Sequence, residues 1–460
     1  MNNPPVTHHK PSHHRYARFL KWRRLHVTDS GFILLLALVV GILSGVCAWL
    51  LKYLISLITS LAKTGVNTTG SEWLIIFVPT AGITLTALFC RYVLHEKVDN
   101  GVARMVSDLK RHDYKLSAKT IYGSMIASSL TLGFGGTAGS EGPIAYAGAG
   151  IGSKLGQIFH VKPQMLMILI GCGAAAGIAG IFKAPIGGAL FAIEVLRVEL
   201  STVAVMGVFL ATLAASLVAY TLSGCTLDIN VISPGAFDNS TMVWAVLLGV
   251  ICGVYSLYYT HTGELTKRIL ASARQPWLQW IASGLTIGLM IYAFPALYGE
   301  GYDSITNVIN NHPEYITRQG NLPGLFLDMP WLLMATCIGI LLLKGTGASA
   351  TNNGGGVAGD FAPTLFAGCI LGLLYASALD LWGIAHLNAA HYALIAMAGS
   401  MAGIIRAPLM SIFLTTEMVG GVEFLLPAAI VALISYSMVM IIKRDTFYHS
   451  RPFTPPELRP

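Results

Sequence analysis

Hydrophobic positions along this chain are gathered into long runs without strand-like alternation, separated by short polar stretches. Several of these runs exceed the ~20 residues that a helix needs to cross about 30 Å of hydrocarbon, whereas others are shorter and contain Gly or Pro. Short, interrupted helices are tolerated at membrane depth only where they are buried in protein or line a cavity. The pattern predicts an all-α polytopic membrane protein whose spanning and partial helices surround a pathway. The apolar segments lie at 32–60, 73–93, 121–134, 143–158, 165–182, 184–196, 203–222, 242–260, 277–298, 331–347, 361–380, 391–418 and 424–442.

Two stretches of the sequence repeat the same Gly-rich pattern at an offset of 220 residues: GGTAGSEGPIAYAGAGIG from Gly135 and GGVAGDFAPTLFAGCILG from Gly355. A second pair, GIFKAPIGGALFAIE from Gly180 and GIIRAPLMSIFLTTE from Gly403, follows at an offset of 223. We therefore predict two halves, at about 30–222 and 240–445, joined near the polar stretch 223–241. A hydrophobic protein built from two such halves is typical of a transporter.

The distribution of Lys and Arg predicts the topology. The loops 64–72, 223–241 and 383–391 contain neither residue, whereas the first 27 residues and the tail from Lys443 are basic. The positive-inside rule places both termini in the cytoplasm and the uncharged loops outside. HVKPQ after the first repeat is basic and GIAHLNAAH after the second is not, so equivalent loops lie on opposite sides, as in an inverted repeat.

The composition excludes several other classes of protein. Only 11% of the 460 residues are charged, far below the ~25% of soluble domains, and the net charge of +7 is a topology signal. No basic soluble domain that could bind nucleic acid is evident. The seven cysteines show no CxxC or metal-ligand spacing, and we expect no metal and no cofactor. The N-terminal HHKPSHH is expected to be a solvated tail, followed by a basic amphipathic helix in YARFLKWRRL.

Glu141 is the residue on which the functional prediction depends. It lies in Gly-Ser-Glu-Gly-Pro at 139–143, where Pro143 in the first turn and the small residues before it suit a helix that begins inside the membrane. The free N–H groups and the dipole of such a helix attract an anion. The Glu141 carboxylate can occupy the place of that anion and leave it when protonated. A structural role is the alternative, but intramembrane carboxylates are costly and are usually functional.

The second repeat provides the counterpart at 359–363, Gly-Asp-Phe-Ala-Pro. Its N–H groups would complete a two-sided cradle for the anion. An ionised Asp360 that pointed into this cradle would repel an anion. We therefore expect Asp360 to cap its own helix with its side chain turned aside.

With these motifs in order, the chain resembles the CLC chloride channel and transporter family over about 30–450. The segment 139–143 resembles the gating-glutamate motif, and 359–363 resembles the Gly-x-Phe-x-Pro motif. Gly299-Glu300-Gly301-Tyr302 and Lys344 fall where related features lie, and Tyr448 resembles the tyrosine that closes the inner end of the path. The resemblance implies a homodimer of tilted and partial helices, with one anion pathway per subunit. Together with the charge distribution, we expect a cytoplasmic basic N-terminal segment at 1–28, a CLC-type transmembrane domain at 29–445 and a short cytoplasmic tail at 446–460.

This sequence departs from the family pattern at three places. Asp99-Asn100-Gly101-Val102-Ala103 stands where the family usually has Gly-Ser-Gly-Ile-Pro, so the Asn100 amide would replace a serine hydroxyl as the donor to the anion. Ser140 replaces a frequent arginine, which makes the outer mouth less positive. Val195 follows Glu194 where well-studied exchangers have a proton-relay glutamate, although some exchangers lack it. Glu199, one turn on, is a possible substitute, and Glu194 itself is another.

We therefore expect transport of chloride, bound as a substrate ion, in exchange for protons across a bacterial inner membrane. A passive chloride-type channel is the alternative, and a fluoride/proton antiporter is the third. An enzyme is not expected, because neither HExxH nor a nucleophile elbow occurs. The pairs Lys183/Glu194 and Arg406/Glu417, at equivalent steps of the second repeat, are expected to be structural. The residues expected along the anion path are Asn100, Gly101, Ser140, Gly142, Asp360, Phe361, Ala362 and Tyr448, with Glu141 as the gate.

Overall fold

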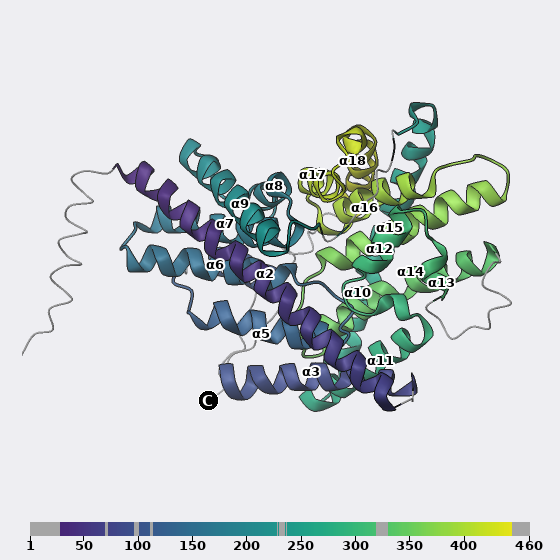
Figure 1. The fold of residues 1–460 in the computed structure, drawn as a ribbon, viewed down its shortest axis with the longest axis horizontal. Helices are drawn as coiled ribbons and strands as arrows, with labels where there is room; N and C mark the ends of the chain where they lie inside the picture. Colours follow the sequence, from purple (N-terminus) through teal and green to yellow (C-terminus); the bar gives the residue numbers. More distant parts are fainter. Residues whose placement is uncertain are drawn as a thin grey trace, which may run out of the picture.

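The computed structural model describes residues 28–69, 72–95, 101–110, 114–227, 229, 235, 237–318 and 330–443. Within these ranges the chain forms helices joined by loops (Figure 1). The β-type pairing of the described residues is an isolated bridge. The helices of the first half are α2 Asp29–Thr69, α3 Val78–Leu88, α4 Gly101–Lys110, α5 Lys119–Gly133, α6 Glu141–Ile158, α7 Pro163–Phe182, α8 Pro185–Glu194 and α9 Thr202–Leu222. Those of the second are α10 Met242–Ala271, α11 Pro276–Ala293, α12 Tyr302–Ile309, α13 Glu314–Arg318, α14 Pro330–Asn353, α15 Phe361–Leu381, α16 Ala389–Ile405, α17 Pro408–Val419 and α18 Leu425–Ile442.

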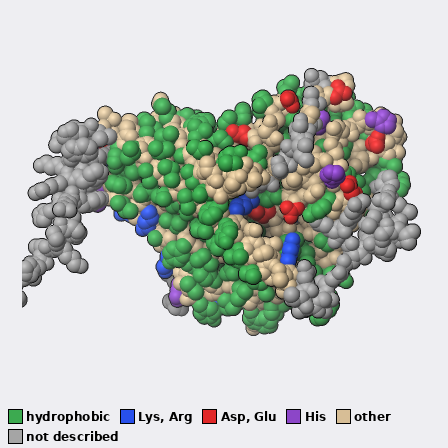
Figure 2. Space-filling view, viewed as in Figure 1, with side chains coloured by type: hydrophobic (Ala, Val, Ile, Leu, Met, Phe, Trp, Pro, Cys, Tyr) green, Lys and Arg blue, Asp and Glu red, His purple; other side chains and the backbone are tan. Residues whose placement is uncertain are grey.

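Spanning and partial helices are both present, which confirms the predicted fold class. Eight segments of the described chain are long and apolar enough to cross a membrane, and three shorter apolar helices accompany them: α8, α16 and α17. Figure 2 shows broad hydrophobic areas on the visible face of the molecule, where charged side chains are few. Such a surface suits contact with lipid, and the protein is a multi-pass membrane protein.

The apolar run 391–418, read from the sequence as one segment, contains two helices. Arg406 has a φ of 63° and ends α16, and Pro408 then begins α17. Lys183 has the same left-handed conformation, with a φ of 55°, between α7 and α8. Proline fixes a helical φ and lacks the N–H that a first-turn residue leaves unused, so Ala-Pro restarts a helix directly after each break.

Helices α8 and α17 cap each other across the two halves. The Glu194 carboxylate at the end of α8 accepts hydrogen bonds from the Leu409 and Met410 N–H groups, at 3.1 and 2.7 Å. The Glu417 carboxylate near the end of α17 accepts hydrogen bonds from the Ile186 and Gly187 N–H groups, at 3.1 and 2.8 Å. Equivalent helices therefore run antiparallel, which inverted topology requires.

Close glycine contacts fix the two helices that begin at the Gly-rich motifs. A Cβ on Gly148 of α6 would lie 2.0 Å from the Gly173 carbonyl oxygen of α7. In the second half, a Cβ on Gly372 of α15 would lie 2.2 Å from the Tyr392 carbonyl oxygen of α16. Only glycine permits such an approach, and small residues at helix interfaces are how membrane helices pack closely. The α6/α7 and α15/α16 pairs thus hold the beginnings of α6 and α15 in the protein interior.

Candidate functional site

The two Gly-rich loops meet in the interior of the protein. Gly139 and Gly359 form an antiparallel bridge, in which each backbone N–H donates to the carbonyl of the other, at 2.9 and 2.5 Å. Helices α6 and α15 begin two residues after this bridge. The repeat seen in the sequence therefore places two helix N-termini at one junction.

A third helix begins at the same place. A Cβ on Gly101, the first residue of α4, would lie 2.5 Å from the Gly142 carbonyl oxygen and 3.0 Å from the Tyr146 Cβ. A Cβ on Gly359 would lie 2.6 Å from the Gly142 backbone nitrogen. Gly142 is thus in contact with both other segments. The first N–H groups of a helix have no partner within it and carry the positive end of its dipole, so the junction is suited to an anion.

The Glu141 carboxylate lies within this junction. The side chain is fully buried, and its Oε1 accepts a hydrogen bond of 3.1 Å from the Tyr302 hydroxyl. Its Oε2 has no hydrogen-bond partner among the described residues. A Cβ built on Gly139 would lie 2.0 Å from this oxygen, and one built on Gly359 would lie 3.2 Å from it. The carboxylate therefore folds back over the beginning of its own helix and faces the opposite loop.

A buried cation accompanies Glu141. Lys344 of α14 is fully buried, donates to the Thr137 hydroxyl at 2.8 Å and lies 4.6 Å from the centre of the Phe366 ring. A charge buried in the membrane interior is costly, so the Lys344 ammonium needs these polar and aromatic partners.

Ser140 is hydrogen-bonded to Glu300, which forms an ion pair with Lys52 from a distant segment of the chain. Glu300 Oε1 accepts from the Ser140 N–H at 2.9 Å and from its hydroxyl at 2.5 Å, while Glu300 Oε2 pairs with Lys52 Nζ at 3.1 Å. The Lys52 ammonium also lies 4.1 Å from the centre of the Tyr302 ring. Although Ser140 replaces the frequent arginine, Lys52 of α2 supplies a positive charge beside it.

Lys52 was missed in the sequence analysis, and Glu300 and Lys344 were noted only by their position. The signal was present for Lys52, because it interrupts the apolar run 32–60, where a charged residue is costly. Nothing in the spacing indicated that it would meet Glu300, which is 248 residues away.

The prediction that Asp360 caps its own helix is wrong. The residue has φ −107° and ψ 0°, outside the extended conformation of most capping residues, and its side chain makes no capping bond. Its side chain is turned aside: Oδ1 accepts a hydrogen bond of 2.8 Å from the Asn352 amide of α14. Phe361 and Ala362 are fully buried, and the Phe361 ring packs edge-on against Phe191 of α8 at 5.8 Å. Asp360 therefore supplies no side-chain cap to α15.

The two candidates for an inner proton relay, Glu194 and Glu199, differ in hydrogen bonding and exposure. Both oxygens of Glu194 are occupied by the beginning of α17, and Val195 is buried. Helix α8 ends at Glu194, so Glu199 is not one helical turn beyond Val195; it is exposed in the loop before α9. Asn100 and Tyr448 lie outside the described residues.

The family model described as voltage gated chloride channel matches residues 82–440, which include the whole junction except Lys52. The chain belongs to the CLC family. CLC proteins are anion transporters or channels, and the junction of helix N-termini lies within the matched region.

Individual relatives agree with this family. The chain is 30% identical over 336 residues to the voltage-gated ClC-type chloride channel ClcB of Escherichia coli, which covers 70% of this chain and 73% of that protein. A slow cyanobacterial Cl⁻/H⁺ antiporter superposes with a TM-score of 0.75 at 20% identity, over 90% of this chain and 96% of that one. A CLC-type fluoride/proton antiporter gives 0.68 at 25% identity, over 88% and 94%. The fold is therefore that of CLC transporters.

Proposed function

We propose that this protein exchanges chloride for protons, with Glu141 as both gate and proton acceptor. The observation that carries the proposal is the position of the Glu141 carboxylate, buried at the beginning of α6 and facing the Gly359 loop. While ionised, it takes the place of an anion at the facing helix N-termini. Protonation removes its charge, the dipoles no longer hold it, and a chloride ion takes its place.

Several further residues would complete the anion path. The backbone N–H groups at Gly101, Ser140, Gly142, Phe361 and Ala362 are expected to face the ion, with Asn100 and Tyr448 as side-chain donors. Asp360, whose side chain is hydrogen-bonded to Asn352, would leave the beginning of α15 open to the anion.

The proposal includes the coupling of chloride movement to proton movement. Two of the similar structures are described as proton antiporters, of chloride and of fluoride, whereas the E. coli relative is named a channel. Val195, a buried residue that cannot carry a proton, favours the second candidate function, a passive chloride-type channel. A fluoride/proton antiporter is the third candidate function.

We further propose that the protein works as a homodimer in a bacterial inner membrane with both termini in the cytoplasm. The first half ends in α9, whose Met206, Leu213 and Leu217 are exposed, as is Leu433 of α18. These side chains suit contact with lipid or with a second subunit.

Flux from liposomes with a pH electrode outside tests the proposal. Wild-type protein should release chloride and take up protons together, and chloride efflux without proton uptake would favour the channel. Glu141→Gln keeps the shape of the side chain but cannot ionise, so chloride flux should persist while proton movement stops. If both fluxes survive unchanged, the assignment of Glu141 as the gate is wrong.

A further inference from the structure

Two carboxylates, not one, lie at the beginning of α6. Glu141 is the first residue of the helix, and Glu300 comes from the loop before α12, yet it binds the residue that precedes Glu141. The Glu300 side chain is only 9% exposed. Three groups donate hydrogen bonds to its carboxylate: the Ser140 N–H, the Ser140 hydroxyl and the Lys52 ammonium. Such donors bind a free anion by the same charge-assisted hydrogen bonds.

The donors around Glu300 differ from those of an ordinary ion pair. A structural ion pair would need only Lys52, whereas Glu300 Oε1 turns away from the lysine to the Ser140 N–H at the N-terminus of α6. That N–H belongs to the end of the helix dipole that attracts anions. The unpartnered Oε2 of the fully buried Glu141 lies one residue further along the same helix start.

We propose that Glu300 is a second gating carboxylate, which closes the outer mouth by occupying the place of an incoming anion beside Ser140 and Lys52. When Glu300 leaves, Lys52 and the Ser140 N–H are the donors that first receive a small monovalent anion. The ion then moves on to the place held by Glu141. This inference rests on the proposed anion transport but not on proton coupling.

The Tyr302 side chain links the two carboxylates. Its hydroxyl donates to Glu141, and its ring lies beneath the Lys52 ammonium that holds Glu300. A movement of Lys52 toward an arriving anion therefore disturbs the ring that positions Glu141. The two carboxylates are placed to open in sequence, with the outer one first.

Substitutions of the two members of the ion pair should have opposite effects on anion affinity. Glu300→Gln removes the competing charge and leaves Lys52 available, so the half-saturating concentration of external chloride should fall by about three- to tenfold. Lys52→Gln removes the receiving cation, so that concentration should rise by a similar factor. A merely structural ion pair would give a loss of folded protein, or the same direction of change, in both variants.

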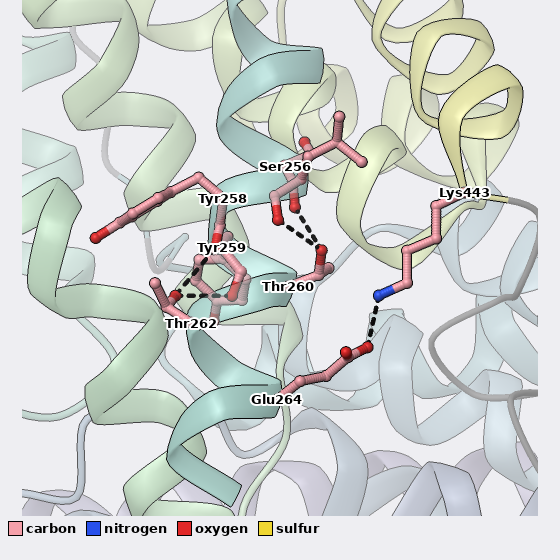
Figure 3. A network of polar contacts seen from close by, with 8 residues as sticks. Ser256, Tyr258, Tyr259, Thr260, Thr262, Glu264 and Lys443 are labelled. Carbon is pink, nitrogen blue, oxygen red and sulfur yellow. Dashed lines mark hydrogen bonds and ion pairs between the residues drawn. The ribbon is translucent and has the colours of Figure 1, made fainter. Parts of the chain in front are cut away.

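The measurement is the initial rate of chloride uptake into right-side-out membrane vesicles as external chloride is varied. The matched control is Glu264→Gln, which breaks a Lys–Glu pair between α10 and the residue after α18, Lys443, at 2.6 Å (Figure 3). It should leave the half-saturating concentration unchanged. If Glu300→Gln does not fold, Glu300→Ala carries the test, since it also removes the competing carboxylate and should shift the concentration in the same direction.

The proposal is overturned if Glu300→Gln leaves the half-saturating concentration unchanged or raises it, or if both members of the pair shift it in the same direction. Glu141→Gln in the same vesicles separates this failure from that of the proposed function. If Glu141→Gln loses proton coupling while Glu300→Gln behaves as wild type, only the second gate is rejected. If the wild type couples protons to chloride and Glu141→Gln still does so equally, the first gate is rejected, whatever Glu300 shows.

Discussion

Within the described part of the chain, carboxylates from one segment approach the N-termini of α-helices at the α8/α17 pair and at the α6/α15 pair, and the two pairs differ. At α8 and α17, Glu194 and Glu417 each bind two N–H groups of the other helix, and the arrangement is the same in both directions. At α6 and α15 the arrangement is one-sided. Glu141 and Glu300 gather at the beginning of α6, whereas the side chain of Asp360 turns away from α15.

The difference separates a structural use of the same chemistry from a functional one. A carboxylate whose two oxygens both accept hydrogen bonds from backbone N–H groups is held in place by these charge-assisted bonds. The Oε1 of Glu141 accepts a hydrogen bond from the Tyr302 hydroxyl, whereas its Oε2 has no partner among the described residues. A buried acceptor left without a partner is costly, so this side chain is poised to be replaced by an ion or neutralised by a proton.

Among the substitutions considered, Gly139→Ala should have the largest effect on proton coupling. The added Cβ would lie 2.0 Å from Glu141 Oε2, and the carboxylate is the flexible partner, so it must swing out of the junction. We expect proton coupling to fall by roughly tenfold or more, because displacing one well-placed hydrogen-bonded group costs about 1–3 kcal/mol. Coupled chloride and proton flux from liposomes measures this.

The control is Gly65→Ala, where a Cβ would meet nothing within 4 Å. This variant should keep the wild-type ratio of chloride to proton flux. Unaltered coupling in Gly139→Ala would show that the Glu141 carboxylate does not need its observed position.

Loss of the symmetric caps should affect stability rather than transport. Glu417→Ala or Glu194→Ala leaves two N–H groups at a helix beginning without their acceptor, which should cost about 1–3 kcal/mol. Thermal unfolding in detergent should show a lower midpoint for both variants, by similar amounts, with normal coupling in the protein that remains folded. Lost proton coupling in Glu194→Ala at normal stability would contradict this, and would make Glu194 the inner relay.

The sequence predicted the symmetric part of the protein better than the asymmetric part. The repeated Gly-rich and Ala-Pro motifs indicated two halves, and the distribution of Lys and Arg indicated that they are inverted. The helix beginnings at Pro185 and Pro408 follow from the local chemistry of proline. Glu141 could be singled out for the same local reason. The resemblance to CLC proteins rested on these motifs.

The partners of Glu141 could not be predicted, because they depend on tertiary packing. Lys52 and Glu300 are 248 residues apart, and Tyr302 is 161 residues from Glu141. The capping role expected of Asp360 failed for a related reason: backbone dihedral angles and a neighbouring amide on α14 decide where the side chain points. Local sequence patterns give no information on these dihedral angles or on which side chain lies nearby.

Tyr302→Phe is expected to have a smaller effect. It removes the hydroxyl that donates to Glu141 but keeps the ring beneath Lys52. The loss of about 1 kcal/mol of hydrogen bonding should release the carboxylate more readily and raise chloride flux about fivefold at neutral pH. A matched control is Tyr258→Phe, which removes a hydroxyl that donates to the Leu342 carbonyl and not to Glu141. Equal rates in the two variants would show that Tyr302 does not restrain the gate.

Asn100→Ser should have the smallest effect, and it concerns selectivity. A hydroxyl and an amide both donate to an anion, so total chloride flux should change by less than about threefold. The ratios of nitrate and fluoride flux to chloride flux should shift, which liposome assays with each anion measure. Identical ratios in wild type and variant would exclude Asn100 from the anion path.

The most direct test of the account is the number of chloride ions that the purified protein binds. If the Glu141 carboxylate occupies the place of an anion, isothermal titration calorimetry should show one more chloride bound per subunit in Glu141→Gln than in the wild type at the same pH. Glu194→Gln, which alters a carboxylate at the symmetric pair, should bind the wild-type number. The same number of ions in wild type and Glu141→Gln would contradict the account.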